Sequence, residues 1–186
     1  KGQHVGDDGF ATIQVDGDLN TINAGGFASI YAVFDGSGNQ AMFGDSRLTA
    51  IVNASNTSLT GGDGNNYVFV DAKVNFTKVK FGDGNETVSD HGNFTEVVLG
   101  DGDESITAGG TFSVIKVGDG NSVINTTAES FGSQVTLGGG NHTVEIDGDG
   151  NVVTTTGNLV GSTTVAGFFN TLNATGDGDY SITLGG

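Results

Sequence analysis

The sequence predicts an all-β protein, a parallel β-solenoid in which one strand-and-turn unit stacks on the next. Two repeating patterns predict this fold. One is a run of aliphatic residues at steps of nine or eleven: Leu59, Val68, Val79, Val88, Val97, Ile106, Ile115, Ile124, Val135, Val144 and Val153. The other is a column of glycines at steps of 18 to 20: Gly6, Gly25, Gly44, Gly62, Gly82, Gly100, Gly118, Gly138, Gly157 and Gly176. Such fixed periods are typical of solenoids.

One coil, residues 82–99, illustrates the repeating unit. We expect a turn over residues 82–85, a short strand over 86–89, a second turn over 90–93 and a second strand over 94–99. Glycine reaches the positive φ angles of sharp turns at little cost, and β-branched residues favour strands. The expected core contacts of this coil are Val88, Phe94, Val97 and Leu99. The sequence therefore predicts a two-sided β-roll of about ten coils, each of about 19 residues.

Composition limits the classes of function. The 186 residues contain no proline, cysteine or tryptophan, and the net charge is -16. Such a surface repels nucleic acid and anionic lipid, and no apolar run is long enough to span a bilayer. We expect a single domain over residues 1–186. Because the repeat runs to the last residue without a polar cap, we expect a segment of a longer rod or the subunit of a polymer that associates end to end.

The half-coils resemble the RTX nonapeptide, G-G-x-G-x-D-x-U-x, in which U is a large aliphatic residue. The matching segments are 62–68, 82–88 and 100–106. The resemblance implies an extracellular β-roll that binds calcium. The sequence departs from the family at the calcium-ligating aspartate, whose position is occupied by Asn66, Glu86, Glu104, Ser122, His142 and Tyr180.

A column of aspartates is the clearest candidate for metal binding. Each follows a glycine of the repeating column: Asp7, Asp45, Asp63, Asp83, Asp101, Asp119 and Asp177. Stacked carboxylates repel one another by roughly 1 kcal/mol per pair in water, and a divalent cation reverses that sign. We expect Asp63, Asp83, Asp101 and Asp119 to be the best-placed calcium ligands. The alternative is that these aspartates only favour the turn and point into solvent.

Other repeated residues have mainly structural interpretations. We expect the asparagines at 65, 85, 121 and 141 to bond along the rod, and Phe76, Phe94, Phe112 and Phe131 to stack in the core. The histidines at positions 4, 91 and 142 are expected at the surface. Eight N-x-S/T sequons are candidate glycosylation sites: Asn53, Asn56, Asn75, Asn85, Asn93, Asn125, Asn141 and Asn173.

Three functions follow from these patterns. The leading hypothesis is an extracellular structural or adhesive protein, such as a rod segment of a filament, surface layer or adhesin, whose partners are further copies or a cell-surface or matrix glycan. The first alternative is an enzyme acting on acidic polysaccharide. Such an enzyme needs basic groups that neutralise uronates, and this chain offers only one arginine and a stripe of Lys78, Lys80 and Lys116. The second alternative is an ice-binding face formed by Thr87, Ser105, Thr143 and Ser181, which Val123 interrupts. We expect no catalytic residues.

Overall fold

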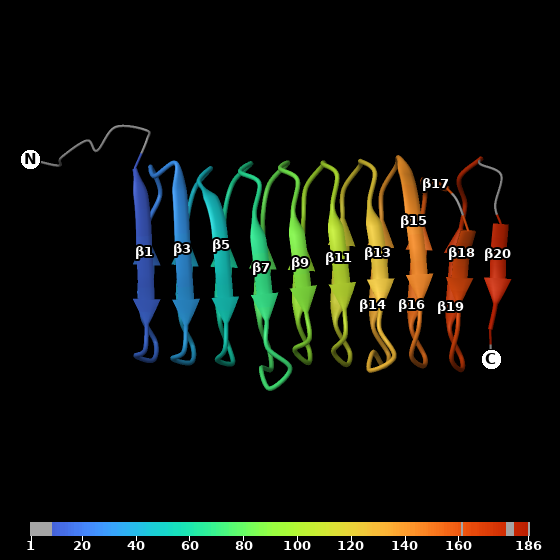
Figure 1. The fold of residues 1–186 in the computed structure, drawn as a ribbon, viewed down its shortest axis with the longest axis horizontal. Coiled ribbons are helices and arrows are strands. Elements are labelled where there is room, and N and C mark those ends of the chain that lie inside the picture. The colour runs from blue at the N-terminus through green and yellow to red at the C-terminus, as the bar shows by residue number, and fades with distance from the viewer. Residues whose placement is uncertain (1–8, 161, 178–180, 186) are drawn as a thin grey trace, which may run out of the picture.

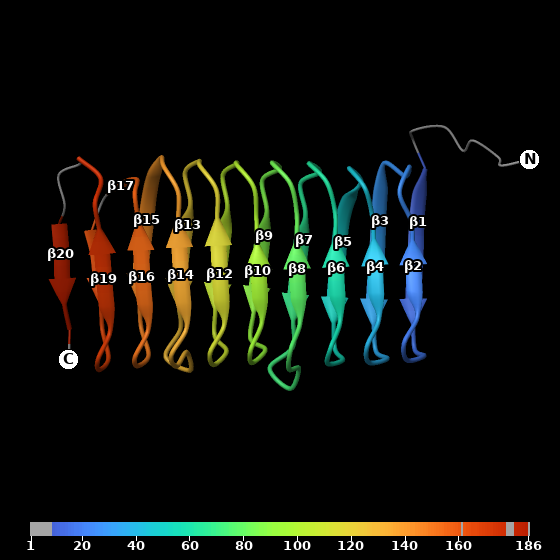
Figure 2. The ribbon, with the colours of Figure 1, turned by 180° about the vertical axis from the view of Figure 1, so that it is seen from behind.

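The computed structural model describes residues 9–160, 162–177 and 181–185, and all regular structure in them is β-strand. The chain winds back and forth between two parallel sheets, which face each other along the whole length of the stack (Figure 1). Figure 2 shows the second sheet from behind. Among the described residues there is no helix of the length and apolarity needed to cross a membrane.

The two sheets, here called the larger and the smaller sheet, divide the strands between them. The larger contains β1 (Phe10–Val15), β3 (Ser29–Phe34), β5 (Arg47–Val52), β7 (Tyr67–Val70), β9 (Thr87–Asp90), β11 (Ser105–Ala108), β13 (Val123–Thr126), β15 (Asn141–Ile146), β18 (Ser162–Val165) and β20 (Ser181–Leu184), with β17 (Asn158–Leu159) beside β15. The smaller contains β2 (Thr21–Asn23), β4 (Gln40–Met42), β6 (Ser58–Thr60), β8 (Lys78–Lys80), β10 (Glu96–Val98), β12 (Val114–Val117), β14 (Gln134–Leu137), β16 (Val152–Thr155) and β19 (Thr171–Ala174).

Strand pairing confirms the predicted solenoid and its repeat length. Neighbouring strands are parallel, and paired residues are 18 to 20 positions apart, as in Thr87 with Ser105 and Tyr67 with Thr87, except that β17 pairs with β15 at an offset of 17. The described chain completes about nine turns, one fewer than the sequence suggested. The stack is therefore a straight rod with its axis perpendicular to the strands (Figure 1).

The core is the predicted aliphatic run. Every member from Leu59 to Val153 is at most 1 % exposed, and the side chains come alternately from the larger and the smaller sheet. Because strand residues alternate between two faces, each strand sends its odd or its even positions inward. Burial of each such side chain contributes roughly 1.5–3 kcal/mol, so the core supplies most of the stabilisation.

The phenylalanines are not in the core, which corrects the sequence-based expectation. Phe76, Phe94, Phe112 and Phe131 are 47–60 % exposed. The first three have φ between 55° and 59°, a left-handed conformation that turns the side chain away from the interior. They lie in the turn between the two sheets, where the alternation of a strand does not apply. A hydroxyl residue follows each of the first three, as Thr95 follows Phe94, and is buried in its place.

The exposed rings still stack, but on the outside of the rod. Ring centroids are 5.1 Å apart for Phe76 and Phe94, and 5.5 Å apart for Phe94 and Phe112, with nearly parallel planes. Phe131 meets Phe112 edge-on at 5.4 Å, because in its coil Gly132 takes the positive φ and Phe131 precedes it. The prediction of stacking holds, whereas the prediction of burial is wrong.

The opposite turns bring successive coils too close for side chains at the glycine positions; they are here called the G-D-G-N turns after residues 62–65, 82–85 and 118–121, and residues 100–103 form the same turn with the sequence G-D-G-D. A Cβ atom at Gly102 would overlap the carbonyl oxygen of Gly84 in the preceding coil, and one at Gly118 would overlap Oδ1 of Asp101. From Gly62 to Gly176 the glycines of the repeating column are therefore required by close approach of successive coils, and so are glycines such as Gly102 two residues further on.

We predict that Gly102→Ala lowers the free energy of unfolding by about 2 kcal/mol or more, because the neighbouring coil must move to admit the methyl group. Gly25→Ala is the matched control, since the atom nearest to its Cβ lies 3.8 Å away. The control should change stability by less than about 0.5 kcal/mol. Urea denaturation of the three proteins measures both values, and equal losses in the two variants would contradict the close-approach argument.

Candidate functional site

The aspartate column lies in the G-D-G-N turns and is exposed. In each turn Oδ1 of the aspartate accepts a hydrogen bond from the main-chain N–H one coil further along. The pairs are Asp45 with Asp63 (3.2 Å), Asp63 with Asp83 (3.0 Å), Asp83 with Asp101 (3.0 Å), Asp101 with Asp119 (2.8 Å) and Asp119 with Gly139 (2.6 Å). The column thus binds coil to coil. Asp7 lies outside the described residues.

The asparagine column repeats this bond two residues later in the same turn. The side chain of Asn65 accepts a hydrogen bond from the N–H of Asn85, and that of Asn85 accepts one from the N–H of Asp103, each at 3.0 Å. The same bond joins Asp103 to Asn121 and Asn121 to Asn141. The structural interpretation of these asparagines is confirmed. The acceptor is the side-chain oxygen and the donor is main chain, whereas the sequence had suggested bonds between stacked amides.

Calcium coordination at the aspartate column would need several oxygen atoms from neighbouring coils. Each Oδ1 already accepts one hydrogen bond from a main-chain N–H, which uses part of the acceptor capacity of each carboxylate. Calcium takes six to eight oxygen ligands. Within the described parts of the chain, no three histidine, aspartate or glutamate side chains converge as a metal ion requires. The residues Asp63, Asp83, Asp101 and Asp119 therefore do not form a closed ligand set, and calcium association stays a prediction.

A polar column runs through the interior beside the G-D-G-N turns. The strand register aligns its members, which are 0–4 % exposed: Asn66, Glu86, Glu104, Ser122 and His142. These are the residues at the position of the RTX calcium-ligating aspartate. Ser122 Oγ donates to Glu104 Oε2 at 2.9 Å, and Asn66 Nδ2 donates to Glu86 Oε1 at 3.3 Å. The hydrogen bonds link neighbouring coils inside the rod.

The polar column contains two buried carboxyl groups, and Asp90 is a further buried carboxyl group whose pKa burial raises. Glu86 and Glu104 lie in adjacent coils, and one oxygen of each, Glu86 Oε2 and Glu104 Oε1, has no hydrogen-bond partner among the described residues. Burial raises the pKa of both groups to about 7, although hydrogen bonds from Asn66 and Ser122 act in the opposite direction. Glu104, Asp63 and Asp83 raise the pKa of Glu86 further.

The same acidic surroundings act on Glu104, whose pKa Asp103 and Asp101 raise in addition to burial. Among the largest contributions to the two shifts, every charged neighbour is acidic. Both glutamates are therefore substantially protonated at neutral pH, so that each can donate as well as accept a hydrogen bond. Sequence reasoning missed this pair, since it treated the position only as a departure from an aspartate motif.

Two of the three histidines can be compared with the expected surface position. His142 is wholly buried, and its Nε2 lies 3.1 Å from the carbonyl oxygen of Gly138. The surface expectation is wrong for this residue, because its position in the repeat is an interior one. His91 is partly buried, 3.1 Å from the Ser89 hydroxyl and beside the Phe69 ring. His4 lies outside the described residues.

The eight sequon asparagines differ in exposure and in whether their side chains form hydrogen bonds within the protein. Asn53 donates to Asp35 at 2.7 Å, and Asn93 donates to Asn75 at 3.2 Å. Asn85 and Asn141 belong to the asparagine column. Asn56 and Asn173 are exposed and Asn125 is partly buried. Glycosylation at these positions stays a prediction.

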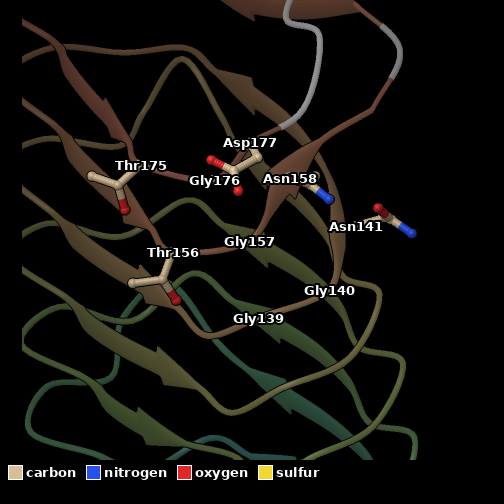
Figure 3. Close-up of a pocket in the computed structure, with 9 residues that line it drawn as sticks. All are labelled: Gly139, Gly140, Asn141, Thr156, Gly157, Asn158, Thr175, Gly176 and Asp177. Atoms are coloured by element: carbon tan, nitrogen blue, oxygen red, sulfur yellow. The ribbon is translucent and has the colours of Figure 1, made fainter.

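A recess of about 470 Å³ interrupts the G-D-G-N edge near the last coils (Figure 3). The register changes along β15 in this region: the sequence offset between partners is smaller for Asn141 with Asn158 than for Glu145 with Thr164. The turn before β17 is thus shorter. The recess is lined by glycine backbone, by hydroxyl and amide groups and by one carboxylate, that of Asp177. It can accept hydrogen-bonding solutes, but it contains no pair of acid–base groups.

Four basic side chains lie on the outer faces of the two sheets, three on the smaller sheet and one on the larger. Lys78, Lys80 and Lys116 lie on the outer face of the smaller sheet, as expected for the stripe, and Lys78 forms an exposed ion pair with Glu96 at 2.8 Å. Arg47, at the start of β5, lies between two depressions on the outer face of the larger sheet. Sequence reasoning gave Arg47 no role. The sequence feature that could have drawn attention to Arg47 is a pair of tyrosines, Tyr31 and Tyr67, which are two coil lengths apart along the sequence.

Comparison with protein-family models, with curated proteins and with solved structures finds no match to this chain. The RTX likeness accordingly rests on the turns and on the coil architecture alone.

We predict that the rod is most stable at acidic pH. The folded pKa of Glu86 and Glu104 is about 7 and the ordinary value is 4.5, so their favourable contribution is complete below about pH 4.5 and is lost as pH rises to about 7. Unfolding at pH 6 should release up to about two protons from this pair. Glu86→Gln with Glu104→Gln should reduce this slope to the part that the buried Asp90 contributes, and Glu145→Gln, at an exposed position, should retain the full slope. Chemical denaturation from pH 4 to 8 measures the slopes; a double variant with the wild-type slope would refute the assignment.

We predict that millimolar calcium raises the melting temperature by a few degrees through loose association with the aspartate column. Asp83→Asn with Asp101→Asn keeps both Oδ1 acceptors but removes two charges, so it should fold and respond less to calcium. Asp149→Asn is the control, because Asp149 accepts from Phe168 at the opposite turn. Melting curves with calcium and with EDTA test this. An unchanged wild-type melt, or equal responses in both variants, would remove calcium from the account.

Proposed function

We propose that this chain is a segment of an extracellular rod, a filament, surface-layer or adhesin component built as an RTX-like β-roll. One observation supports this most: the cohesive contacts repeat along a single axis. The aspartate and asparagine columns, the interior polar column and the stacked phenylalanines all join one coil to the next. Such a structure resists extension and bending along its length, as a spacer requires.

The last strand supports association with a further coil. In β20, Ile182 is 48 % and Leu184 is 78 % exposed, although their partners in β18 are Thr163 and Val165, which continue the interior columns. β20 pairs with β18 on one side, and no strand of the described residues lies on its other side. An open strand edge with apolar interior positions is a template for another coil, from a second copy or from further sequence.

The extracellular location is supported by the likeness of the turns to the RTX nonapeptide, and the role is a structural one. A surface with net charge -16 keeps such rods dispersed until their ends meet.

We predict that the 186-residue chain associates end to end as concentration rises. Leu184→Asp places a charge at an interior position of β20 and should abolish association. Thr183→Asp is the control, because Thr183 alternates to the outer face of the same strand and should leave association intact. Small-angle scattering and negative-stain microscopy measure particle length. Compact particles, or monomers at every concentration, would count against the proposal.

A further inference from the structure

Two shallow depressions lie side by side on the outer face of the larger sheet, near the starts of β1 to β9. One, of about 250 Å³, is lined by Phe10, Ser29, Ile30, Tyr31, Arg47 and Thr49. The other, of about 380 Å³, is lined by Arg47, Thr49, Asn65, Asn66, Tyr67, Asn85 and Thr87. Arg47 and Thr49 belong to both. The two depressions are therefore neighbours along the rod axis with Arg47 on their common border, and together they are here called the arginine groove.

Arg47 supplies an unused cation to this groove. It is the only arginine in a chain with 22 acidic residues. It is exposed, and within residues 9–160, 162–177 and 181–185 the single ion pair is that of Lys78 with Glu96. A guanidinium group has five donors in a planar fork that matches a carboxylate. An arginine left without an internal carboxylate at a groove is suited to an external one.

The other polar groups of the arginine groove also present donors. Asn65 and Asn85 hold their Oδ1 atoms toward the main-chain N–H groups of Asn85 and Asp103, each at 3.0 Å. This fixes both side chains and leaves their Nδ2 groups as donors without a partner among the described residues. Thr49 and Thr87 add hydroxyl groups. The groove can thus hydrogen-bond a ligand rich in hydroxyl and carboxylate oxygen.

The tyrosines give the arginine groove its spacing. The register aligns Tyr31 with Thr49 and Thr49 with Tyr67, so the two rings lie two coils apart, about 10 Å at the usual strand separation. This distance is comparable with the length of a disaccharide. Tyr67 is 42 % exposed, and tyrosine combines an apolar ring with a polar hydroxyl. Two such rings, in the coils on either side of the one that carries Arg47, suit an extended chain of sugars.

We propose that the arginine groove binds an extended glycan that carries carboxylates, a polyuronate. Arg47 binds one carboxylate through its two-pronged fork, Tyr31 and Tyr67 contact apolar sugar faces, and Asn65 and Asn85 bind hydroxyl groups. This inference gives the adhesive role a ligand class and rests on the proposed function. Asp45, Asp63 and Asp83 occupy neighbouring turns and oppose the approach of an anion, so affinity depends strongly on the arginine.

Isothermal titration of the 186-residue chain with a hexauronate and with a neutral glucose hexamer tests the proposal. The hexauronate should bind, and the neutral hexamer should bind about tenfold more weakly or worse. Arg47→Gln should weaken hexauronate binding at least about tenfold and erase this preference. Arg47→Lys should recover only part of it, because the fork is lost. Tyr67→Ala should weaken both ligands.

Lys80→Gln, which removes a positive charge from the opposite sheet, is the matched control and should change nothing. No binding at millimolar hexauronate, or equal losses in Arg47→Gln and Lys80→Gln, would overturn the proposal. Scattering on the same samples keeps the two proposals apart. Arg47→Gln should leave particle length and association unchanged, so a failure of glycan binding with rods intact would reject the arginine groove alone.

Discussion

Close approach of the main chain at the G-D-G-N turns is the constraint on which the rest of the structure depends. Glycine at positions such as Gly84, Gly102 and Gly118 lets consecutive turns lie in direct contact. Only then do the side chains of Asp83 and Asn85 reach the N–H groups of the following coil. The spacing also fixes the register of both sheets, and hence the alignment of the aliphatic core. A side chain at these glycines would disturb hydrogen bonding, register and core together.

The parts of this structure that follow a fixed period could be predicted from sequence. The aliphatic run, the turn glycines and the coil length each depend on a repeat that one sequence displays in full. The phenylalanine column shows the limit of this reasoning. Phe94 recurs as regularly as Val97, but its left-handed backbone turns it outward, and periodicity does not report the sign of φ. His142 was misplaced for the opposite reason, since a polar residue was assumed to avoid an interior position.

The candidate sites were harder to predict from the sequence, because they depend on residues that are neighbours in space. Glu86 and Glu104 are one coil apart along the sequence, and their significance lies in burial of both carboxyl groups in adjacent coils. Arg47, Tyr31 and Tyr67 are likewise inconspicuous along the chain, and only the register shows that the two tyrosines lie in the coils on either side of the arginine. In a solenoid the coil length converts sequence distance into spatial distance. A search for chemistry at separations of one and two coils is therefore more informative than a search for local motifs.

The longest coils carry a consequence for the tolerance of the scaffold. Their additional residues, relative to the shorter coils, lie in the turns that follow β7 and β13, and the larger loop after β7 projects beyond the edge of the stack (Figure 1). The G-D-G-N turns keep their alignment from coil to coil before and after each enlarged turn. One border of the rod is thus rigidly specified while the other accommodates additional chain. Insertions of whole peptides, natural or engineered, have a permissive place there, spaced at intervals set by the winding itself.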